Sequence, residues 1–329
     1  MEIAKAIILA GVVGRERPHP AVGTGGPYLF PIANRPLLFH HLESLRRGGL
    51  LEATILVDPG AQEPTARAVA EGGPWNLTIR FGECPATDSV QRALEACRSF
   101  IGEEPVLVQR ADTLLGGRLH AHIAAFSKDR LDAMTLRLAP DPGRQAADTP
   151  PGCLLSPRAL TLLMERSDPV SDLLSEVRAC GGRVREQAVD GCLCAGDVDA
   201  LLDANRRILQ ELVPGAGGTP AEGCVLQGPV AIHPSAHLRR TTVRGPAVIG
   251  PGARCSDSYI GPYTSIGPDV AIDGAEIEHS IVLPGAQIAF VGARIESSVI
   301  GRRARVARTF TKPSSVRVSI GDGAEVLIS

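Results

Sequence analysis

The last third of the chain repeats small apolar residues at intervals of six. Glycine and proline, as in Gly250-Pro251 and Gly267-Pro268, mark the ends of the repeating units. A six-residue period with such corners is typical of a parallel β-helix, in which each hexapeptide forms one face of a coil. The sequence therefore predicts a β-helix domain over residues 225–329, with the repeating residues stacked inside. These residues form three runs with six-residue steps, namely Val243, Ile249 and Cys255, then Ile260, Ile266 and Ile272, then Val282 and Ile288.

The first 212 residues follow a different pattern. Apolar runs at 6–9, 53–57 and 105–108 alternate with helix-like segments such as 37–47 and 89–99. Strands that alternate with helices favour right-handed crossovers and a mostly parallel sheet covered on both faces. We therefore expect an α/β domain over residues 1–212. A Gly- and Pro-rich stretch at 213–224 has the composition of a linker between the two domains.

Composition excludes several classes of partner. The 329 residues carry a net charge of -2, which gives no electrostatic reason to expect nucleic acid or a membrane as partner. No apolar run is long enough to span a bilayer and no signal peptide is evident, so we expect a cytoplasmic protein. The eight cysteines show no repeating spacing and are interpreted as reduced side chains. The chain has only three lysines, Lys5, Lys128 and Lys312.

The N-terminal strand leads into a glycine-containing loop. Residues 7–10 form an apolar run that ends at Gly11, and Gly14 follows closely. Without a Cβ, these glycines allow the backbone to approach a phosphate group. The stretches FPIANRPLLFHHLESLRRGGL, LLDANRRILQEL, SYIGPYTSIG and EIEHSIVLPGA accompany this loop. With them, nearly the whole chain resembles the sugar-1-phosphate nucleotidyltransferases, in particular the long type of glucose-1-phosphate thymidylyltransferase.

The resemblance implies a fold and a chemistry. It implies a Rossmann-like nucleotidyltransferase domain with a mostly parallel sheet, followed by a left-handed parallel β-helix. In that family a sugar 1-phosphate attacks the α-phosphorus of a nucleoside triphosphate and expels pyrophosphate. Two anions must meet, so Mg²⁺ on carboxylates and Arg or Lys donors are required. By the same resemblance, the nucleotide-binding positions are Ala10, Gly11, Gly14, Arg17 and Ser89, and the catalytic positions that remain are Arg17 and Asp112.

Several family positions have changed in this sequence. Pro27 stands where the family places its catalytic lysine, and proline has no proton to donate. Cys194 stands where the family places its second metal-binding aspartate, and Mg²⁺ prefers oxygen ligands. Ser89 replaces a glycine of the base-reading loop. Asp112 keeps the first metal-binding position, so the resemblance leaves at most a weak Mg²⁺ site there.

Three interpretations follow from the family positions that are kept and those that are replaced. The first is a catalytically impaired nucleotidyltransferase homologue that keeps a pocket for a nucleotide or sugar phosphate and acts as a binding, regulatory or scaffold subunit. The second is an active nucleotidyltransferase with relocated catalytic groups. The third, based on His279 in the β-helix, is a hexapeptide acyltransferase. We favour the first, and we expect a homo-oligomer, a trimer or a multiple of one, because a β-helix exposes flat faces and open ends.

Overall fold

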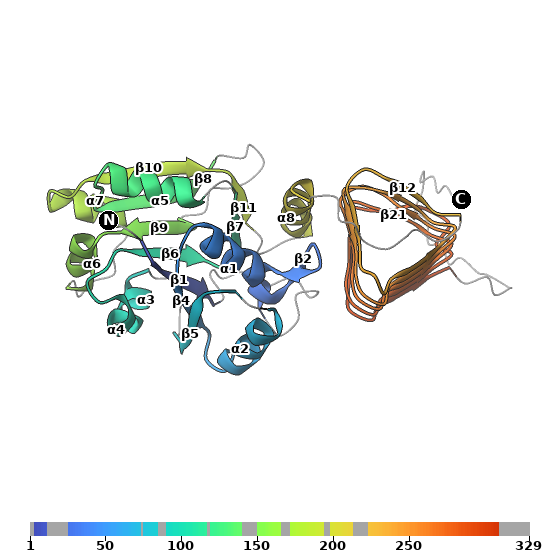
Figure 1. Ribbon diagram of the computed structural model, residues 1–329, viewed down its shortest axis with the longest axis horizontal. Helices are drawn as coiled ribbons and strands as arrows, with labels where there is room; N and C mark the ends of the chain where they lie inside the picture. Colours follow the sequence, from blue (N-terminus) through green and yellow to red (C-terminus); the bar gives the residue numbers. More distant parts are fainter. Residues whose placement is uncertain are drawn as a thin grey trace, which may run out of the picture.

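The computed structural model describes residues 3–11, 26–73, 75–84, 90–116, 119–139, 150–165, 172–193, 198–212 and 223–308. These residues form an α/β domain and a β-helix, with helix α8 (Val198–Gln210) between them (Figure 1). The last α/β element thus ends at Gln210, and the first β-helix strand begins at Val225. Within the described ranges, no helix is both long and apolar enough to cross a membrane.

The α/β domain is built on a seven-stranded sheet with the order β10-β8-β9-β6-β1-β4-β5. Strand β9 is antiparallel to both of its neighbours, and the other pairings are parallel. This arrangement confirms the expected mostly parallel sheet. The strands are β1 (Lys5–Ala10), β4 (Glu52–Val57), β5 (Thr78–Glu83), β6 (Val106–Arg110), β8 (Ala133–Leu138), β9 (Gly152–Leu155) and β10 (Val184–Val189).

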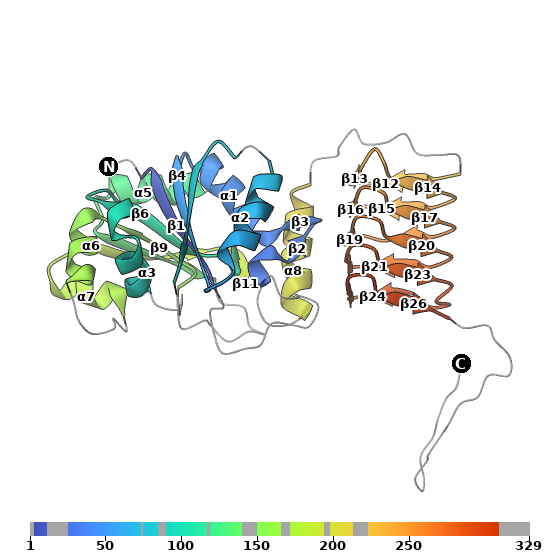
Figure 2. The same cartoon turned by 90° about the horizontal axis from the view of Figure 1, so that it is seen from below.

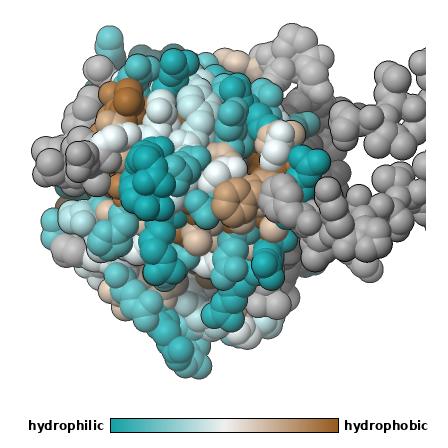
Figure 3. Space-filling view, turned by 90° about the vertical axis from the view of Figure 1, so that its right-hand side faces the viewer, coloured by the Kyte–Doolittle hydropathy of each residue, from teal (hydrophilic) through white to brown (hydrophobic). Residues whose placement is uncertain are grey.

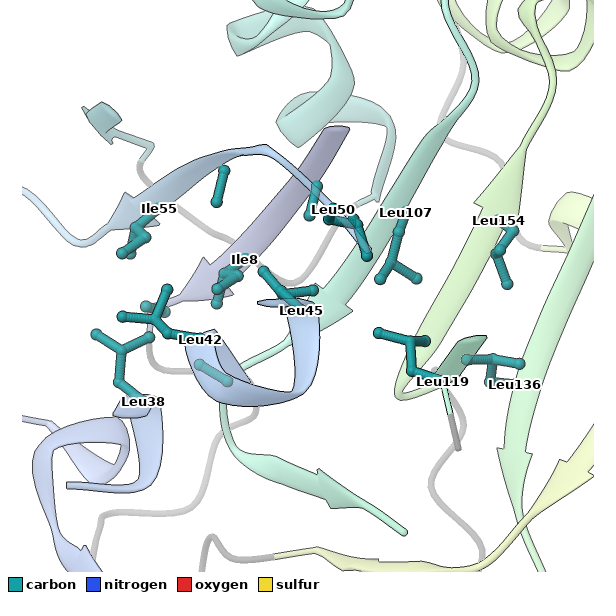
Figure 4. Close-up of a cluster of buried hydrophobic side chains, with 14 of the residues drawn as sticks. Ile8, Leu38, Leu42, Leu45, Leu50, Ile55, Leu107, Leu119, Leu136 and Leu154 are labelled. Atoms are coloured by element: carbon teal, nitrogen blue, oxygen red, sulfur yellow. The ribbon is translucent and has the colours of Figure 1, made fainter. Parts of the chain in front are cut away.

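Helices cover both faces of this sheet, because alternate residues of each central strand point to opposite sides. Ile8 of β1 packs with α1 (Leu37–Arg47), α2 (Gln62–Glu71) and α5 (Leu119–Lys128), as the cluster around Leu42 in Figure 4 shows. Ile7, one residue earlier, packs on the opposite face. The helices of that face are α3 (Val90–Ala96), α4 (Arg98–Ile101), α6 (Pro157–Met164) and α7 (Leu173–Ala179).

Local sequence explains where two of these helices begin or end. The side chain of Ser156 accepts a hydrogen bond from the backbone of Ala159 at 3.2 Å, which caps α6, and Pro157 occupies its first turn. Helix α1 ends at Gly48, and Gly49 follows with a φ of +85°. Glycine adopts this left-handed conformation without the steric cost of a Cβ, so the chain can turn back into the sheet.

The C-terminal domain is a left-handed parallel β-helix of three five-stranded sheets. Figure 1 shows its triangular outline end-on, and Figure 2 shows the stacked coils from the side. The first sheet contains β12 (Val225–Gln227), β15 (Thr242–Arg244), β18 (Tyr259–Ile260), β21 (Glu276–Glu278) and β24 (Ile295–Glu296). The second contains β13 (Val230–Ile232), β16 (Ala247–Ile249), β19 (Thr264–Ile266), β22 (Ile281–Val282) and β25 (Val299–Ile300). The third contains β14 (His237–Arg239), β17 (Arg254–Ser256), β20 (Ala271–Asp273), β23 (Gln287–Ala289) and β26 (Arg305–Ala307).

The predicted repeat residues all lie in one buried cluster inside the β-helix. Their vertical stacking, however, follows a coil rather than a strict six-residue period. Val243 pairs with Ile260, and Ile260 pairs with Ile277, which is a step of seventeen residues. One corner of these coils is therefore shorter than three full hexapeptides would allow. Asp257 stands at this corner with a φ of +49°, a left-handed turn conformation that asparagine and aspartate tolerate better than most residues.

The outside of the β-helix is mainly hydrophilic. Figure 3 shows the side turned away from the α/β domain, where hydrophobic residues lie scattered among hydrophilic ones. Val225 and Phe290 are the exposed large hydrophobic residues among the described part of this domain, at 46% and 47% exposure. Isolated apolar residues of this kind are normal on a protein surface and do not by themselves identify an interface.

Candidate functional site

The carboxyl ends of β1 and β6 lie side by side at one edge of the sheet. Leu9 pairs with Arg110, and the backbone N–H of Ala111 donates to the carbonyl of Leu9 at 2.9 Å. Ala10 and Gly11, where the chain leaves β1, are buried. In open α/β sheets, ligands bind outside the carboxyl ends of the strands. The structure therefore brings Ala10, Gly11 and Asp112 together at the edge where a ligand is expected.

Other predicted site residues fall outside the described residues. Gly14 and Arg17 belong to residues 12–25, Ser89 to residues 85–89, and Cys194 to residues 194–197. Their predicted roles therefore remain predictions. The backbone of Pro27 is described and lies in a short 3-10 helix, η2 (Pro27–Leu29).

Asp112 is held by an arginine from its own strand end. Arg110 Nε donates to Oδ1 of Asp112 at 2.9 Å, and Arg110 Nη2 donates to Oδ2 at 2.6 Å. The hydroxyl of Thr113 adds a hydrogen bond to Oδ1 at 3.1 Å. Arg110 is 8% exposed and Asp112 is 2% exposed. The carboxylate is thus paired in a bidentate geometry and removed from solvent, which is the strongest kind of side-chain ion pair.

Arg110 is the residue beside Asp112 that the sequence interpretation did not single out. It lies at the end of the otherwise uncharged run Val106–Gln109, in a strand whose residues are all buried. A charged side chain in such a strand needs a partner, since arginine is almost never fully buried unpaired. Residues two apart on an extended strand point to the same side, so Asp112 is the partner that spacing alone could have suggested.

A neutral histidine supports the same strand end from α1. His41 Nε2 lies 3.1 Å from the carbonyl of Ala111, and its Nδ1 lies 2.9 Å from Nε2 of Gln109. Because the amide nitrogen of Gln109 can only donate, Nδ1 accepts and Nε2–H donates to the carbonyl. Burial lowers the pKa of His41 from 6.5 to about 4, and this effect outweighs the opposing hydrogen bond to the carbonyl of Ala111. His41 therefore stays neutral near pH 7 and fixes the backbone before Asp112.

A two-stranded ribbon continues from Asp112. Strand β7 (Thr113–Leu115) pairs antiparallel with β11 (Gly191–Leu193), and Thr113 lies opposite Leu193. Cys192 of β11 is buried with Leu201 and Leu202 of α8. The described pairing stops at Thr113, directly after Asp112, and at Leu193, directly before Cys194. Cys192 is thus part of an apolar cluster, where a cysteine side chain packs as a small hydrophobic group.

The described lysines lie away from Asp112. Lys5 begins β1 at the opposite, amino end of the sheet, and its Nζ lies 3.3 Å from the carboxylate of Glu104. Lys128 is exposed in the last turn of α5. Lys312 lies outside the described residues. Neither described lysine is placed to take over the role that the family gives to the position of Pro27.

The region after the glycine-containing loop is attached to the β-helix. Asn205 of α8 is fully buried and accepts hydrogen bonds from the backbone of Ala33 at 2.9 Å and the hydroxyl of Ser265 at 2.6 Å. Its Nδ2 donates to the carbonyl of Tyr263 at 3.0 Å. Ala33 lies in the turn between β2 (Pro31–Ile32) and β3 (Arg35–Pro36). One amide side chain therefore links this turn, α8 and the β-helix.

His279 does not resemble an accessible catalytic base. Its Nδ1 lies 3.2 Å from the hydroxyl of Ser297 in the next coil, and its ring meets Tyr263 of the previous coil edge-on. Its Nε2 is buried and has no hydrogen-bond partner among the described atoms. A general base must be within reach of the proton that it removes. A buried Nε2 gives no support to the acyltransferase interpretation.

Sequence comparisons reveal relatives that match the chain along its length. It is 30% identical to a glucose-1-phosphate thymidylyltransferase from Streptomyces griseus, over 99% of both chains. It is 28% identical to another from Streptomyces antibioticus, over 98% of this chain and 99% of that one. A low-salt glycan biosynthesis nucleotidyltransferase from Haloferax volcanii is 24% identical over 98% of this chain. No family profile matches the chain.

The structural comparison agrees on the fold. A crystal structure from Bacillus anthracis, described as a glucose-1-phosphate thymidylyltransferase in complex with sucrose, superposes with a TM-score of 0.54. It covers 64% of this chain and 97% of that chain, at 16% sequence identity. At such low identity the match shows a shared fold and does not transfer a substrate. Together with the full-length match at 30% identity, the fold establishes that this chain belongs to the sugar-1-phosphate nucleotidyltransferase family.

Proposed function

We propose that this protein is a nucleotidyltransferase homologue with impaired catalysis, which binds a nucleotide or sugar phosphate and acts as a binding, regulatory or scaffold subunit. The observation that carries the proposal is the bidentate pair between Arg110 and Asp112. Nucleotidyl transfer brings two anions together and depends on cationic groups aimed at the charge that develops in the transition state. The carboxylate at the family's metal position is here already neutralised by a neighbouring side chain.

Changes at two other family positions further weaken the electrostatic stabilisation of the transition state. Pro27 replaces the family's lysine, and Cys194 replaces its second metal-binding aspartate. Each lost electrostatic contact of this kind costs roughly 3 kcal/mol of transition-state stabilisation. The described strand ends keep the family's fold, so on this proposal ligand binding is retained although the charge arrangement for turnover is lost. Weak Mg²⁺ binding at Asp112 would require the carboxylate to leave Arg110.

An active enzyme with relocated catalytic groups is the second candidate. It is favoured by the full-length similarity to proteins named glucose-1-phosphate thymidylyltransferase. In that case Arg17 and other residues of the loop after Gly11 would have to supply the missing charge. The two candidates differ in one measurable property, namely turnover by the unmodified chain.

A pyrophosphate-release assay with thymidine triphosphate, glucose 1-phosphate and Mg²⁺ tests the proposal. We expect no release above background from the wild-type chain. The double variant Pro27→Lys, Cys194→Asp and the triple variant that adds Arg110→Leu should gain activity in that order, because only the triple variant also frees Asp112. The control is Lys128→Leu in the same triple background, which changes an exposed lysine. Robust wild-type turnover that is lost in Asp112→Ala would establish the active-enzyme candidate instead.

Binding and assembly need separate measurements. A thermal-shift screen with nucleoside triphosphates, nucleotide sugars and sugar phosphates should reveal a ligand that raises the unfolding temperature, because a ligand that binds only the folded state stabilises it. We also propose a homo-oligomer, a trimer or a multiple of one, assembled through the faces or ends of the β-helix. Light scattering that gives a monomer at all concentrations would contradict the assembly without affecting the binding proposal.

A further inference from the structure

We propose that the Arg110 guanidinium takes the place of a divalent cation beside Asp112, so that the phosphate ligand of this site binds without a metal ion. The identity of the ligand rests on the proposed function, whereas the assignment of the cation rests on the contacts of Arg110 alone. The inference starts from a misfit between the residues that the structure places at this edge and the Mg²⁺ that the family resemblance implies.

The first step concerns the oxygens of Asp112. Both are hydrogen-bonded to Arg110, and Oδ1 also accepts from Thr113. A Mg²⁺ ion needs six oxygen ligands in near-ideal octahedral geometry at short distance. To reach Asp112 it would have to displace a guanidinium that already satisfies the carboxylate within a buried site. The residues present therefore do not fit a metal ion.

The second step concerns further metal ligands among the residues that the structure describes. No group of three or more His, Cys, Asp or Glu side chains that could hold a metal occurs in the part of the chain that the structure describes. Mg²⁺ is normally held by one or two carboxylates together with water and substrate phosphates. Asp112 is the carboxylate at this edge for which the family predicts that role. With Arg110 bound to it, the pair carries no net charge that would attract a divalent cation.

The third step concerns what Arg110 can still donate. A guanidinium has five N–H groups and remains protonated at every physiological pH. The bonds to Asp112 use one N–H on Nε and one on Nη2, which leaves three for another acceptor. Arginine is suited to phosphate recognition because its planar fork matches the phosphate oxygens. Arg110 ends β6 next to Leu9, at the edge of the sheet where ligands bind.

Two measurements on the wild-type protein test the proposal. Titration with Mn²⁺, followed by electron paramagnetic resonance, should show no specific site up to millimolar metal. Calorimetry with thymidine triphosphate and a thymidine diphosphate sugar should give affinities that agree within about twofold in EDTA and in Mg²⁺. One bound Mn²⁺ per chain that is lost in Asp112→Asn, or an affinity gain of about tenfold or more on adding Mg²⁺, would overturn the assignment.

Variants that remove the guanidinium of Arg110 test the same proposal from the opposite direction. Arg110→Leu should acquire one Mn²⁺ site, and Mn²⁺ should raise its unfolding temperature. The matched control is Arg240→Leu, which removes an arginine of the same bidentate geometry from the exposed carboxylate of Asp257, leaves Arg239 Nη2 at 3.7 Å from that carboxylate, and should gain no site. If Arg110→Leu fails to fold, Arg110→Gln replaces it, and the wild-type titration decides the assignment in either case. A folded Arg110→Leu protein that binds no Mn²⁺ contradicts the proposal.

Failure of the proposed function gives a different result. If no nucleotide or sugar phosphate binds in either buffer, the ligand pocket and the metal-free binding are both rejected. The Mn²⁺ titrations of wild type, Arg110→Leu and Arg240→Leu do not require a nucleotide, so they still decide whether Arg110 takes the cation's place.

Discussion

Two arginine–aspartate pairs of the same geometry occur in the two domains, and their surroundings differ. In the α/β domain Arg110 holds Asp112 through Nε and Nη2, with side-chain exposures of 9% and 2%. On the β-helix Arg240 holds Asp257 through the same two nitrogens, both at 2.6 Å, with side-chain exposures of 54% and 40%. Water solvates the second pair whether or not it forms, whereas in the first pair Asp112 depends on Arg110 and on one hydrogen bond from the hydroxyl of Thr113.

The difference in burial distinguishes an ion pair on the protein surface from an ion pair that belongs to the candidate site. Asp257 stands at a corner of the β-helix, where hydrogen bonds from Arg240 lower the pKa of its carboxyl group. Loss of either partner there leaves a group that water can stabilise. At Asp112 the same loss leaves a buried charge, so the residue must be replaced together with Arg110 or be compensated by another cation. Burial therefore makes the Arg110–Asp112 pair, here called the inner pair, a determinant of what the site can bind. The Arg240–Asp257 pair on the β-helix is called the outer pair.

Removal of Arg110 should have the largest effect. Arg110→Ala leaves the carboxylate of Asp112 buried without its partner, which typically lowers the free energy of unfolding by about 3–5 kcal/mol. Urea denaturation of the wild type and the variant measures this difference. The double change Arg110→Leu, Asp112→Leu removes both charges and should recover most of the loss. A single variant as stable as the wild type would show that the inner pair behaves like the outer one.

A pH dependence of intermediate size should arise from His41, which supports the inner pair. Its pKa is about 4 in the folded protein, below the ordinary value of 6.5. Between these values the unfolded chain takes up a proton that the folded protein does not, so stability is greatest above pH 6.5 and falls as the pH decreases towards 4. The loss amounts to about 3 kcal/mol for a shift of this size.

Urea denaturation at a series of pH values compares the wild type with His41→Gln. The variant keeps an amide that can donate to the carbonyl of Ala111, but it does not titrate in this range. We expect a flatter dependence of the free energy of unfolding on pH. His40→Gln measures the separate contribution of the neighbouring histidine, because burial also lowers the pKa of His40, which bonds the carbonyl of Ile32. Equal slopes for wild type and His41→Gln would exclude His41 as the source.

The smallest effect is expected at the outer pair. Arg240→Ala removes both hydrogen bonds to Asp257, but both groups remain in contact with water. Exposed ion pairs contribute little to stability, so the midpoint of urea denaturation should not change measurably. A clear loss of stability would mean that the surface corner of the β-helix is more strongly coupled to its core than the exposures of the two side chains suggest.

Much of the fold could be predicted from the sequence, because it depends on local periodicity. The apolar residues of the β-helix and the alternation of strands and helices before it each follow from burial of one face of an element. The register of the coils left a trace in the sequence, because the gap between Cys255 and Ile260 is one residue shorter than the repeat. Only the strand pairing shows that this short corner places Val243 beside Ile260, seventeen residues later. Asp112 follows the end of β6, and its partner Arg110 was not identified from the sequence.

The sequence by itself determined which elements form and which family positions are kept or replaced, since these depend on residue type and short-range spacing. Only the tertiary structure decided what the remaining groups contact. His41 reaches Ala111, and Asn205 reaches both Ala33 and Ser265, because buried polar groups must find partners that packing brings from distant segments. Arg110 is the intermediate case. Its distance of two residues from Asp112 was visible in the sequence. Its exclusion from water depends on the packed sheet, and because of that exclusion the loss of either partner leaves a buried charge.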